Sequence, residues 1–430
     1  REIMGTYASY GVNCVRFHSW CPPEAAFAAA DEAGILVQPE LSHWNPRNAF
    51  STEESRRYYE RELREVLSVY ANHPSFVMLS LGNELQADEA GRTEMKRLVN
   101  LAKSLDPTRL YAWGSNNFYG ERGAWEAGDF YTSASCHENR LRACGNKGPI
   151  NIEYPNAERS FDEAMTVIRE EYDGPVFGFE VGQYQVLPDF SELAAFHGVT
   201  RPDNLTVVWE RARKQGMSDA EWERRVAATG ELSLLGYREE VEAALRTEGM
   251  SGLSLLGLQD FPGQGTALVG MMNAHLSPKP FDFARPERFR GFFAAQRILL
   301  LLPRYTWVRG ETLVAKVKLA NYGSGELRGR LCCEVLNDSP RRYGSGKEKT
   351  KYSEITNGKT IHDTSTVTAT ITIHSDVSVP AGVMQPVGEL HLPLTFSDRA
   401  VRLNLRLRLA DADGGTLLSS TYPVWVYPDE

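Results

Sequence analysis

Two glutamates, Glu84 and Glu180, stand at the ends of short apolar runs. Glu84 closes residues 72–84, NHPSFVMLSLGNE, and Glu180 closes residues 175–180, PVFGFE. An apolar run this short predicts a strand buried on both faces, here with a carboxylate at its end. If the fold brings the two strand ends together, one acid can attack a glycosidic carbon while the other shuttles a proton.

Short apolar runs alternate with helical stretches from residue 11 to about residue 261, which is typical of parallel strands joined by crossover helices. Strands are predicted at residues 12–18, 35–41, 76–81, 110–114, 130–134, 176–180 and 253–258, and helices at 22–33, 52–71 and 91–105. Seven strands are one fewer than a closed parallel barrel contains. In such barrels the active site lies at the carboxyl ends of the strands, where we expect Glu84 and Glu180 to meet.

The pattern changes after about residue 297. In residues 401–409, VRLNLRLRL, every second residue is apolar, and a turn-forming DADGG follows at 411–415; residues 313–319 repeat the alternation. These are half-buried antiparallel strands. We therefore predict an α/β protein: a catalytic (β/α)8 TIM-barrel domain at 1–297, its first strand missing from this chain, and an all-β sandwich domain at 298–430. The helical, charged residues 188–248 leave room for a cap insertion, and the polar residues 340–358 predict a loop.

Composition excludes several classes of function. The 430 residues carry a net charge of -9 that is spread evenly, which gives no footprint for nucleic acid or an anionic membrane. No apolar run is long enough to span a bilayer, and the sequence assigns no compartment. The six cysteines lack paired metal-ligand spacing, and His137 with Glu138 lacks a third ligand. We predict free thiols, no metal and no cofactor.

The quoted motifs carry a family resemblance. Residues 73–84 resemble the acid/base signature of glycoside hydrolase family 2, the group of β-galactosidases, β-glucuronidases and β-mannosidases. Residues 11–18 and 34–40 resemble its second and third barrel strands, and 175–180 the strand that carries the nucleophile. The resemblance covers roughly residues 1–275. It implies a retaining double displacement, in which Glu180 attacks the anomeric carbon and Glu84 protonates the leaving oxygen and then activates water.

The two acids need unlike environments for these roles. We expect donors such as Arg16 or Tyr131 to keep Glu180 ionised, and burial to raise the pKa of Glu84. Asn83 is expected to donate to the sugar 2-hydroxyl. Further candidates for substrate contact follow the predicted strands, although each could instead be a buried structural residue: His18, Arg16, Glu40, Trp44, Trp113, Asn116, Asn117, Tyr131, Gln259 and Asp260.

The chain departs from the family at the last barrel strand. The family commonly places a Trp before an acidic residue there, whereas residues 252–265, GLSLLGLQDFPGQG, contain no Trp. Gln259 and Asp260 are predicted to supply hydrogen bonds instead. The glycine-rich turn lacks the Lys of a phosphate loop, so we reject that function.

The favoured function is a retaining exo-acting β-glycosidase, with β-galactosidase preferred because that activity is widespread in the family. The alternatives are a β-glucuronidase or β-mannosidase, and a carbohydrate-binding subunit without catalysis. A β-glucuronidase would need a basic clamp, for which Asn146-Lys147 is a candidate. The resemblance also implies two β-rich domains and a first barrel strand ahead of Arg1. We expect a missing N-terminal segment or a separate chain to complete the barrel, with a homo-oligomer as an alternative.

Overall fold

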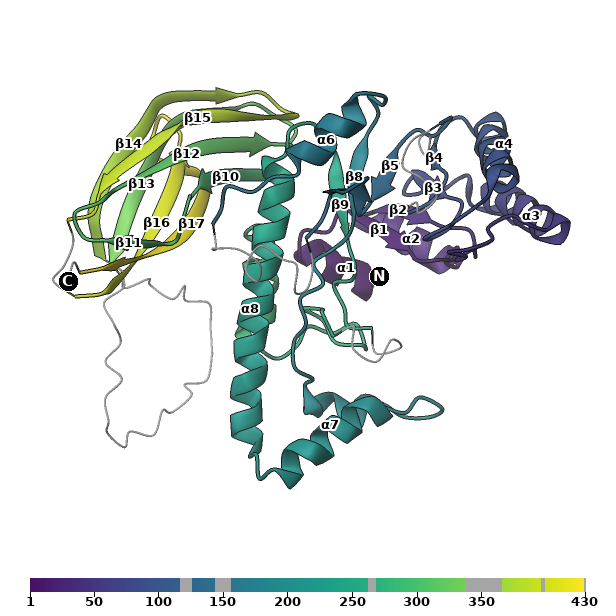
Figure 1. The fold of residues 1–430 in the computed structure, drawn as a ribbon, viewed down its shortest axis with the longest axis horizontal. Helices are drawn as coiled ribbons and strands as arrows, with labels where there is room; N and C mark the ends of the chain where they lie inside the picture. The colour runs from purple at the N-terminus through teal and green to yellow at the C-terminus, as the bar shows by residue number, and fades with distance from the viewer. Residues whose placement is uncertain (117–125, 144–155, 262–267, 338–365, 396–398, 429–430) are drawn as a thin grey trace. The chain divides into compact units, whose positions relative to one another are not determined.

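Parallel strands joined by helices form the first part of the chain, and a pair of sheets forms the last part. The computed structural model in Figure 1 describes residues 1–116, 126–143, 156–261, 268–337, 366–395 and 399–428. The chain divides into two units, Arg1–Tyr154 with Arg159–Ala294, and Pro155–Glu158 with Ala295–Glu430. Each unit has a hydrophobic core of its own.

The strands of the first unit follow one another in chain order. The described residues contain all seven predicted strands: β1 (Cys14–Phe17), β2 (Leu36–Pro39), β3 (Met78–Ser80), β4 (Leu110–Ala112), β5 (Tyr131–Ser133), β8 (Val176–Val181) and β9 (Gly252–Leu255). The pairs β1–β2, β3–β4, β5–β8 and β8–β9 are parallel. A bridge from Glu40 to Ser80 joins β2 to β3, and the Asn116 N–H donates to the Thr132 carbonyl beyond β4. The carboxyl ends of neighbouring strands therefore lie on one side.

Helices occupy the stretches between these strands, as predicted. They are α1 (Glu2–Ser9), α2 (Glu24–Ala33), α3 (Glu53–Tyr70), α4 (Glu89–Leu105), α6 (Asp162–Arg169), α7 (Asp203–Lys214), α8 (Asp219–Arg246) and α9 (Pro286–Arg290). The Thr52 side chain caps α3 by accepting the Ser55 N–H, and α2 ends at Gly34 with φ +68. The helical prediction for 188–248 is confirmed by η2 (Phe190–Ala195), α7 and α8, while its role as a cap stays a prediction. None of the described helices has the length and hydropathy needed to cross a bilayer.

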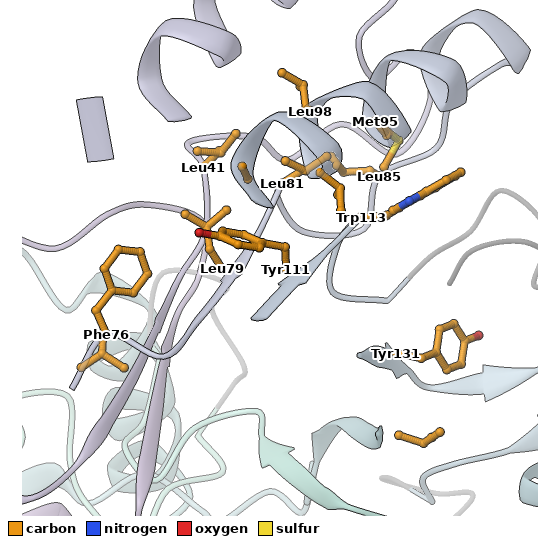
Figure 2. Packing of buried hydrophobic residues seen from close by; sticks show 14 of the residues in the cluster. Leu41, Phe76, Leu79, Leu81, Leu85, Met95, Leu98, Tyr111, Trp113 and Tyr131 are labelled. Atoms are coloured by element: carbon orange, nitrogen blue, oxygen red, sulfur yellow. The ribbon is translucent and has the colours of Figure 1, made fainter. Parts of the chain in front are cut away.

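The apolar faces of α3 and α4 pack into the core that holds β3. One buried cluster, drawn in part in Figure 2, joins side chains of α3, of α4 and of the β3 region: Leu63, Val66, Leu67, Met95, Leu98, Val99, Leu79 and Leu81. On each helix these residues recur at spacings of three and four, which places them on one face. Because burial of each such side chain contributes about 1.5–3 kcal/mol, the end of β3 is held firmly.

Two sheets build the second unit around a shared core. One contains β10 (Gln296–Leu301), β12 (Thr312–Asn321) and β15 (Val383–Pro393), and the other contains β11 (Thr306–Val308), β17 (Thr416–Tyr427), β16 (Val401–Ala410), β13 (Leu327–Asn337) and β14 (Thr366–Val379). All described neighbours are antiparallel except β11 with β17. Leu403, Leu405, Leu407 and Leu409 are fully buried, which confirms the predicted alternation. The predicted loop at 340–358 lies outside the described residues.

Candidate active site

Glu84 and Glu180 lie at the carboxyl ends of β3 and β8, in unusual backbone conformations. Their φ angles are +48° and +47°, in the left-handed region that side chains other than glycine rarely adopt and that costs about 1–2 kcal/mol per residue. Hydrogen bonds hold these conformations: the Glu84 N–H donates to the Ser115 carbonyl (2.8 Å), and the Glu180 N–H to Ser254 Oγ (3.3 Å). Backbone strain of this kind concentrates at functional sites.

Arg16 of β1 joins three strand ends. Its Nε donates to Glu40 Oε1 (2.6 Å), its Nη2 to Asn83 Oδ1 (2.6 Å) and its Nη1 to Glu180 Oε1 (3.3 Å). The guanidinium group is planar and only donates, so it fixes all three acceptors in one plane. Arg16 therefore organises the site from the ends of β1, β2, β3 and β8.

Asn83 acquires a defined orientation from this contact. Because Arg16 can only donate, the Asn83 oxygen must face it, and the amide NH2 group points the other way as a donor. Asn83 is 1% exposed and follows β3 directly before Glu84. This arrangement suits the expected contact with a sugar hydroxyl.

Glu84 is half-buried and accepts from two neutral donors. Trp44 Nε1 donates to Oε2 (3.2 Å) and Asn116 Nδ2 to Oε1 (3.4 Å). Asn116, with φ +58°, is in turn oriented by the Ala134 N–H, which donates to its oxygen (3.1 Å). Trp44 is 53% exposed and meets His18 edge to face, at 5.7 Å between ring centroids. The Glu84 carboxyl thus lies beside an exposed aromatic pair.

Glu180 is the more deeply buried acid, at 9% exposure. Burial raises its pKa above the ordinary value of 4.5, the charges of Arg16 and Arg142 lower it, and the charge of Glu84 raises it further. The influence of Glu84 means that the two carboxylates lie near each other. Arg16 donates to Glu180 as expected, but desolvation at the end of β8 outweighs the two guanidinium groups, and Glu180 rather than Glu84 is the more deeply buried acid.

Glu40 is buried completely beneath the site. Its Oε1 accepts from Arg16 and from Ser115 Oγ (2.6 Å), whereas Oε2 has no hydrogen-bond partner among the described residues. A carboxylate at 0% exposure cannot reach a substrate without rearrangement. Glu40 therefore orients Arg16 and Ser115.

Two aromatic candidates lie in the core rather than beside Glu84. Trp113 is 4% exposed, belongs to the same buried cluster as Leu85 and Met95 (Figure 2), and donates its indole N–H to the Glu126 carbonyl (2.7 Å). Tyr131 is 1% exposed in that cluster, and its hydroxyl donates to the Ser135 carbonyl (3.4 Å). Both rings thus lie in the core of this structure, and their sugar contacts stay predictions. Asn117 lies outside the described residues.

The candidates after the last strand are also engaged elsewhere. Asp260 is 5% exposed and forms a buried ion pair with Lys279 Nζ, at 2.9 Å from Oδ1 and 2.8 Å from Oδ2. Lys279 thus supplies the cation that a buried carboxylate needs, and the hydrogen bond from Asp260 to substrate stays a prediction. Gln259 Oε1 accepts from the Tyr7 hydroxyl (3.1 Å), so Gln259 is not placed in the group around Arg16.

Three residues at the site were not predicted from the sequence. Arg142 Nη1 donates to the carbonyls of Phe179 (2.9 Å) and Glu180 (3.1 Å) and lies 3.9 Å from Glu180 Oε2. Ser115 and Ser254 hold Glu40 and the Glu180 backbone. Ser115 stands just after β4 and Ser254 within β9, so a search of the residues in and after the predicted strands could have found both. Arg142 follows a hairpin, β6 (Ser135–Cys136) and β7 (Asn139–Arg140), and no local pattern marks it.

The sequence also raised the questions of a metal site and of a basic clamp for a glucuronide. Within the described residues, no group of three or more His, Cys, Asp or Glu is arranged to hold a metal ion. Asn146-Lys147 lies outside the described residues. Cys14, Cys21, Cys332 and Cys333 are free thiols.

Comparison with known proteins finds matches to part of the first unit. Residues 7–143 match the family described as "Glycosyl hydrolases family 2, TIM barrel domain". A relative from Formosa agariphila, named "Putative beta-glucuronidase", is 30% identical over 110 residues, which are 25% of this chain and 10% of the relative. This segment, which holds Arg16, Asn83 and Glu84, is therefore similar to the TIM barrel domain of glycoside hydrolase family 2.

Solved structures share the fold. A β-D-mannosidase from Dictyoglomus thermophilum matches with a TM-score of 0.60 and 15% identity, over 99% of this chain and 47% of that chain. The exo-chitosanase CsxA from Amycolatopsis orientalis matches with a TM-score of 0.54 and 13% identity, over 99% and 46%. The chain thus spans about half the length of these enzymes.

Proposed function

We propose that this chain carries the catalytic centre of a retaining exo-acting β-glycosidase. The observation that carries the proposal is the convergence of Glu84 and Glu180 on one space, with Arg16 linking Glu180 to Asn83. Two carboxylates at barrel strand ends, set in unlike surroundings, are the equipment for a double displacement. The match of residues 7–143 to the family of glycosyl hydrolases supports the same chemistry.

The surroundings of each acid match one role. Glu180 lies deep, between two guanidinium groups, so its charge is stabilised as it approaches the anomeric carbon. Glu84 lies nearer the surface, beside Trp44, where a leaving group departs and water enters. Asn83 is oriented to donate to the sugar 2-hydroxyl, a contact that strengthens in the transition state.

The sugar that we propose differs from the sequence-based preference. The matched relatives are named for β-glucuronidase and β-mannosidase rather than β-galactosidase, so these alternatives replace it. We put β-glucuronides first, because the glucuronidase relatives match at the level of sequence and the mannosidase only at the level of fold.

A panel of nitrophenyl β-glycosides tests the proposal. The full chain is expected to hydrolyse the glucuronide or the mannoside with net retention of configuration, observed by NMR of the first product. Glu180→Gln is expected to reduce kcat by about 10⁴-fold or more, whereas the control Glu89→Gln, at an exposed position on α4, retains full activity. Binding of sugar without turnover by the intact chain would favour the carbohydrate-binding alternative, and an inverted product would refute the double displacement.

Leaving-group dependence tests the role of Glu84. Glu84→Ala is expected to slow glycosides of poor leaving groups far more than dinitrophenyl glycosides, because a good leaving group needs no proton. Equal losses with both substrates would assign general acid catalysis to another residue.

A further inference from the structure

A second buried carboxylate, Glu240 of α8, lies behind the turn that carries Glu180. It is 0% exposed. Its Oε1 accepts the Ala143 N–H (2.7 Å) and its Oε2 accepts the Gly182 N–H (3.1 Å). One side chain therefore ties together two segments that are far apart in the sequence.

Both of these segments position Glu180. Gly182 lies two residues after Glu180, and the chain between them turns through φ +47° at Glu180 and φ +81° at Gly182. Ala143 follows Arg142, which donates to the carbonyls of Phe179 and Glu180 and lies 3.9 Å from the Glu180 carboxylate. The contacts form a closed circuit from Glu240 through Gly182, Glu180, Arg142 and Ala143 back to Glu240.

The neighbouring turn of α8 prevents the Gly182 backbone from moving. Tyr237 lies three residues before Glu240, on the same helix face. A Cβ atom on Gly182 would come within 2.0 Å of the Tyr237 ring. The Tyr237 hydroxyl donates to the Val269 carbonyl (2.8 Å), which fixes the ring. Only glycine allows the turn to lie this close to α8 and reach Glu240.

Burial makes the ionised form of the Glu240 carboxyl group unfavourable. Burial raises its pKa to about 8, and the two backbone N–H groups and Arg142 oppose that shift. Without Glu240 the buried Gly182 N–H and the partly buried Ala143 N–H would lose their acceptor. A displacement of about 1 Å in a reacting group can cost about 100-fold in rate, so a fixed turn matters for Glu180.

We propose that Glu240 is a positioning residue for Glu180, acting through the Gly182 and Ala143 amides without contacting substrate. The inference rests on the proposed function for its kinetic consequence. Its structural content, that Glu240 holds the turn, is independent of turnover.

The test compares two buried glutamates on one helix. Glu242 is also 0% exposed on α8, but it contacts Arg238 (3.1 Å) and Arg246 (3.7 Å) rather than the Glu180 turn. In Glu240→Gln one oxygen becomes an NH2 donor facing a backbone N–H. We expect kcat to fall about 10–100-fold with KM within about threefold, while Glu242→Gln keeps kcat within about twofold and changes only thermal stability.

Hydrogen exchange supplies a readout that does not need activity. In Glu240→Gln the peptide covering residues 178–186 is expected to exchange faster than in the wild type, and in Glu242→Gln at the wild-type rate. Should Glu240→Gln not fold, Gly182→Ala displaces the same turn through Tyr237 and is expected to give the same kcat loss. Wild-type kcat and exchange in Glu240→Gln, or equal kcat losses in both glutamate variants, would overturn the inference. Absence of glycoside turnover by the wild type would instead refute the proposed function and leave the exchange result interpretable.

Discussion

The parallel-strand unit and the two-sheet unit differ in their buried carboxylates and in their backbone strain. Every described non-glycine residue with positive φ belongs to the first unit, including Glu84, Asn116 and Glu180. The described part of the first unit also buries nine carboxylates, whereas that of the second unit buries none: Glu40, Glu94, Glu180, Asp189, Glu192, Glu239, Glu240, Glu242 and Asp260.

In the second unit the buried side chain of Asn321 is satisfied locally. Asn321, at 0% exposure, accepts from Gln296 (2.8 Å) and donates to the carbonyls of Gly325 and Val379 (both 2.9 Å). All its hydrogen-bonding groups support the sheets themselves. The comparison teaches that strain and buried charge mark where a fold departs from its most stable arrangement, which is where chemistry is expected.

Arg16 gives the largest expected effect. Arg16→Ala removes the donor to three acceptors and is expected to lower kcat/KM by about 10³-fold, equivalent to about 4 kcal/mol of barrier. Arg16→Lys is expected to rescue little, because an ammonium group cannot reproduce the planar fork. Steady-state kinetics with circular dichroism as a folding control provide the measurement. A fully active lysine variant would contradict the organising role.

Leu405 tests the second unit. Leu405→Ala deletes a fully buried side chain of β16 and is expected to lower the free energy of unfolding by about 3 kcal/mol. Denaturant unfolding measures the loss. The kcat of the folded variant is expected to equal that of the wild type, because β16 carries no site residue. A changed kcat in the folded variant would contradict the assignment of catalysis to the first unit.

A smaller effect is expected from the hydrogen bond between Asn83 and the sugar 2-hydroxyl. Asn83→Ala is expected to lower kcat/KM by about 10–100-fold, the usual effect of one hydrogen bond used in the transition state. With a 2-deoxy substrate the same substitution is expected to have little effect, since the partner hydroxyl is absent. A double-mutant cycle of enzyme and substrate measures this coupling. Equal losses of kcat/KM with both substrates would contradict the contact between Asn83 and the 2-hydroxyl.

The pH dependence gives the smallest expected change. Glu180 must be ionised to attack, and its pKa lies above 4.5 chiefly because of burial. Activity is therefore expected to fall as the pH drops through that raised pKa, which appears as the acid limb of kcat/KM. Arg142 lowers this pKa, so Arg142→Ala is expected to move the limb to higher pH, with a larger loss at pH 5 than at pH 7. A limb moving to lower pH would contradict the assignment.

Much of the architecture was readable from the sequence. The seven parallel strands, their helices and the alternation in residues 401–409 follow from apolar periodicity, because the side chains of a helix or strand face the core at fixed intervals. The same logic placed Glu84 and Glu180 at strand ends and set Arg16 near them. These features depend on neighbours in the chain.

Tertiary structure alone decided which partner each polar side chain meets. It buried Glu180 more deeply than Glu84, gave Asp260 to Lys279 and brought Arg142 and Glu240 to the Glu180 turn. The sequence determines which face an element buries, because hydrophobic burial needs no particular partner. A buried charge needs a partner at hydrogen-bond distance, and that distance exists only once segments remote in sequence have packed together.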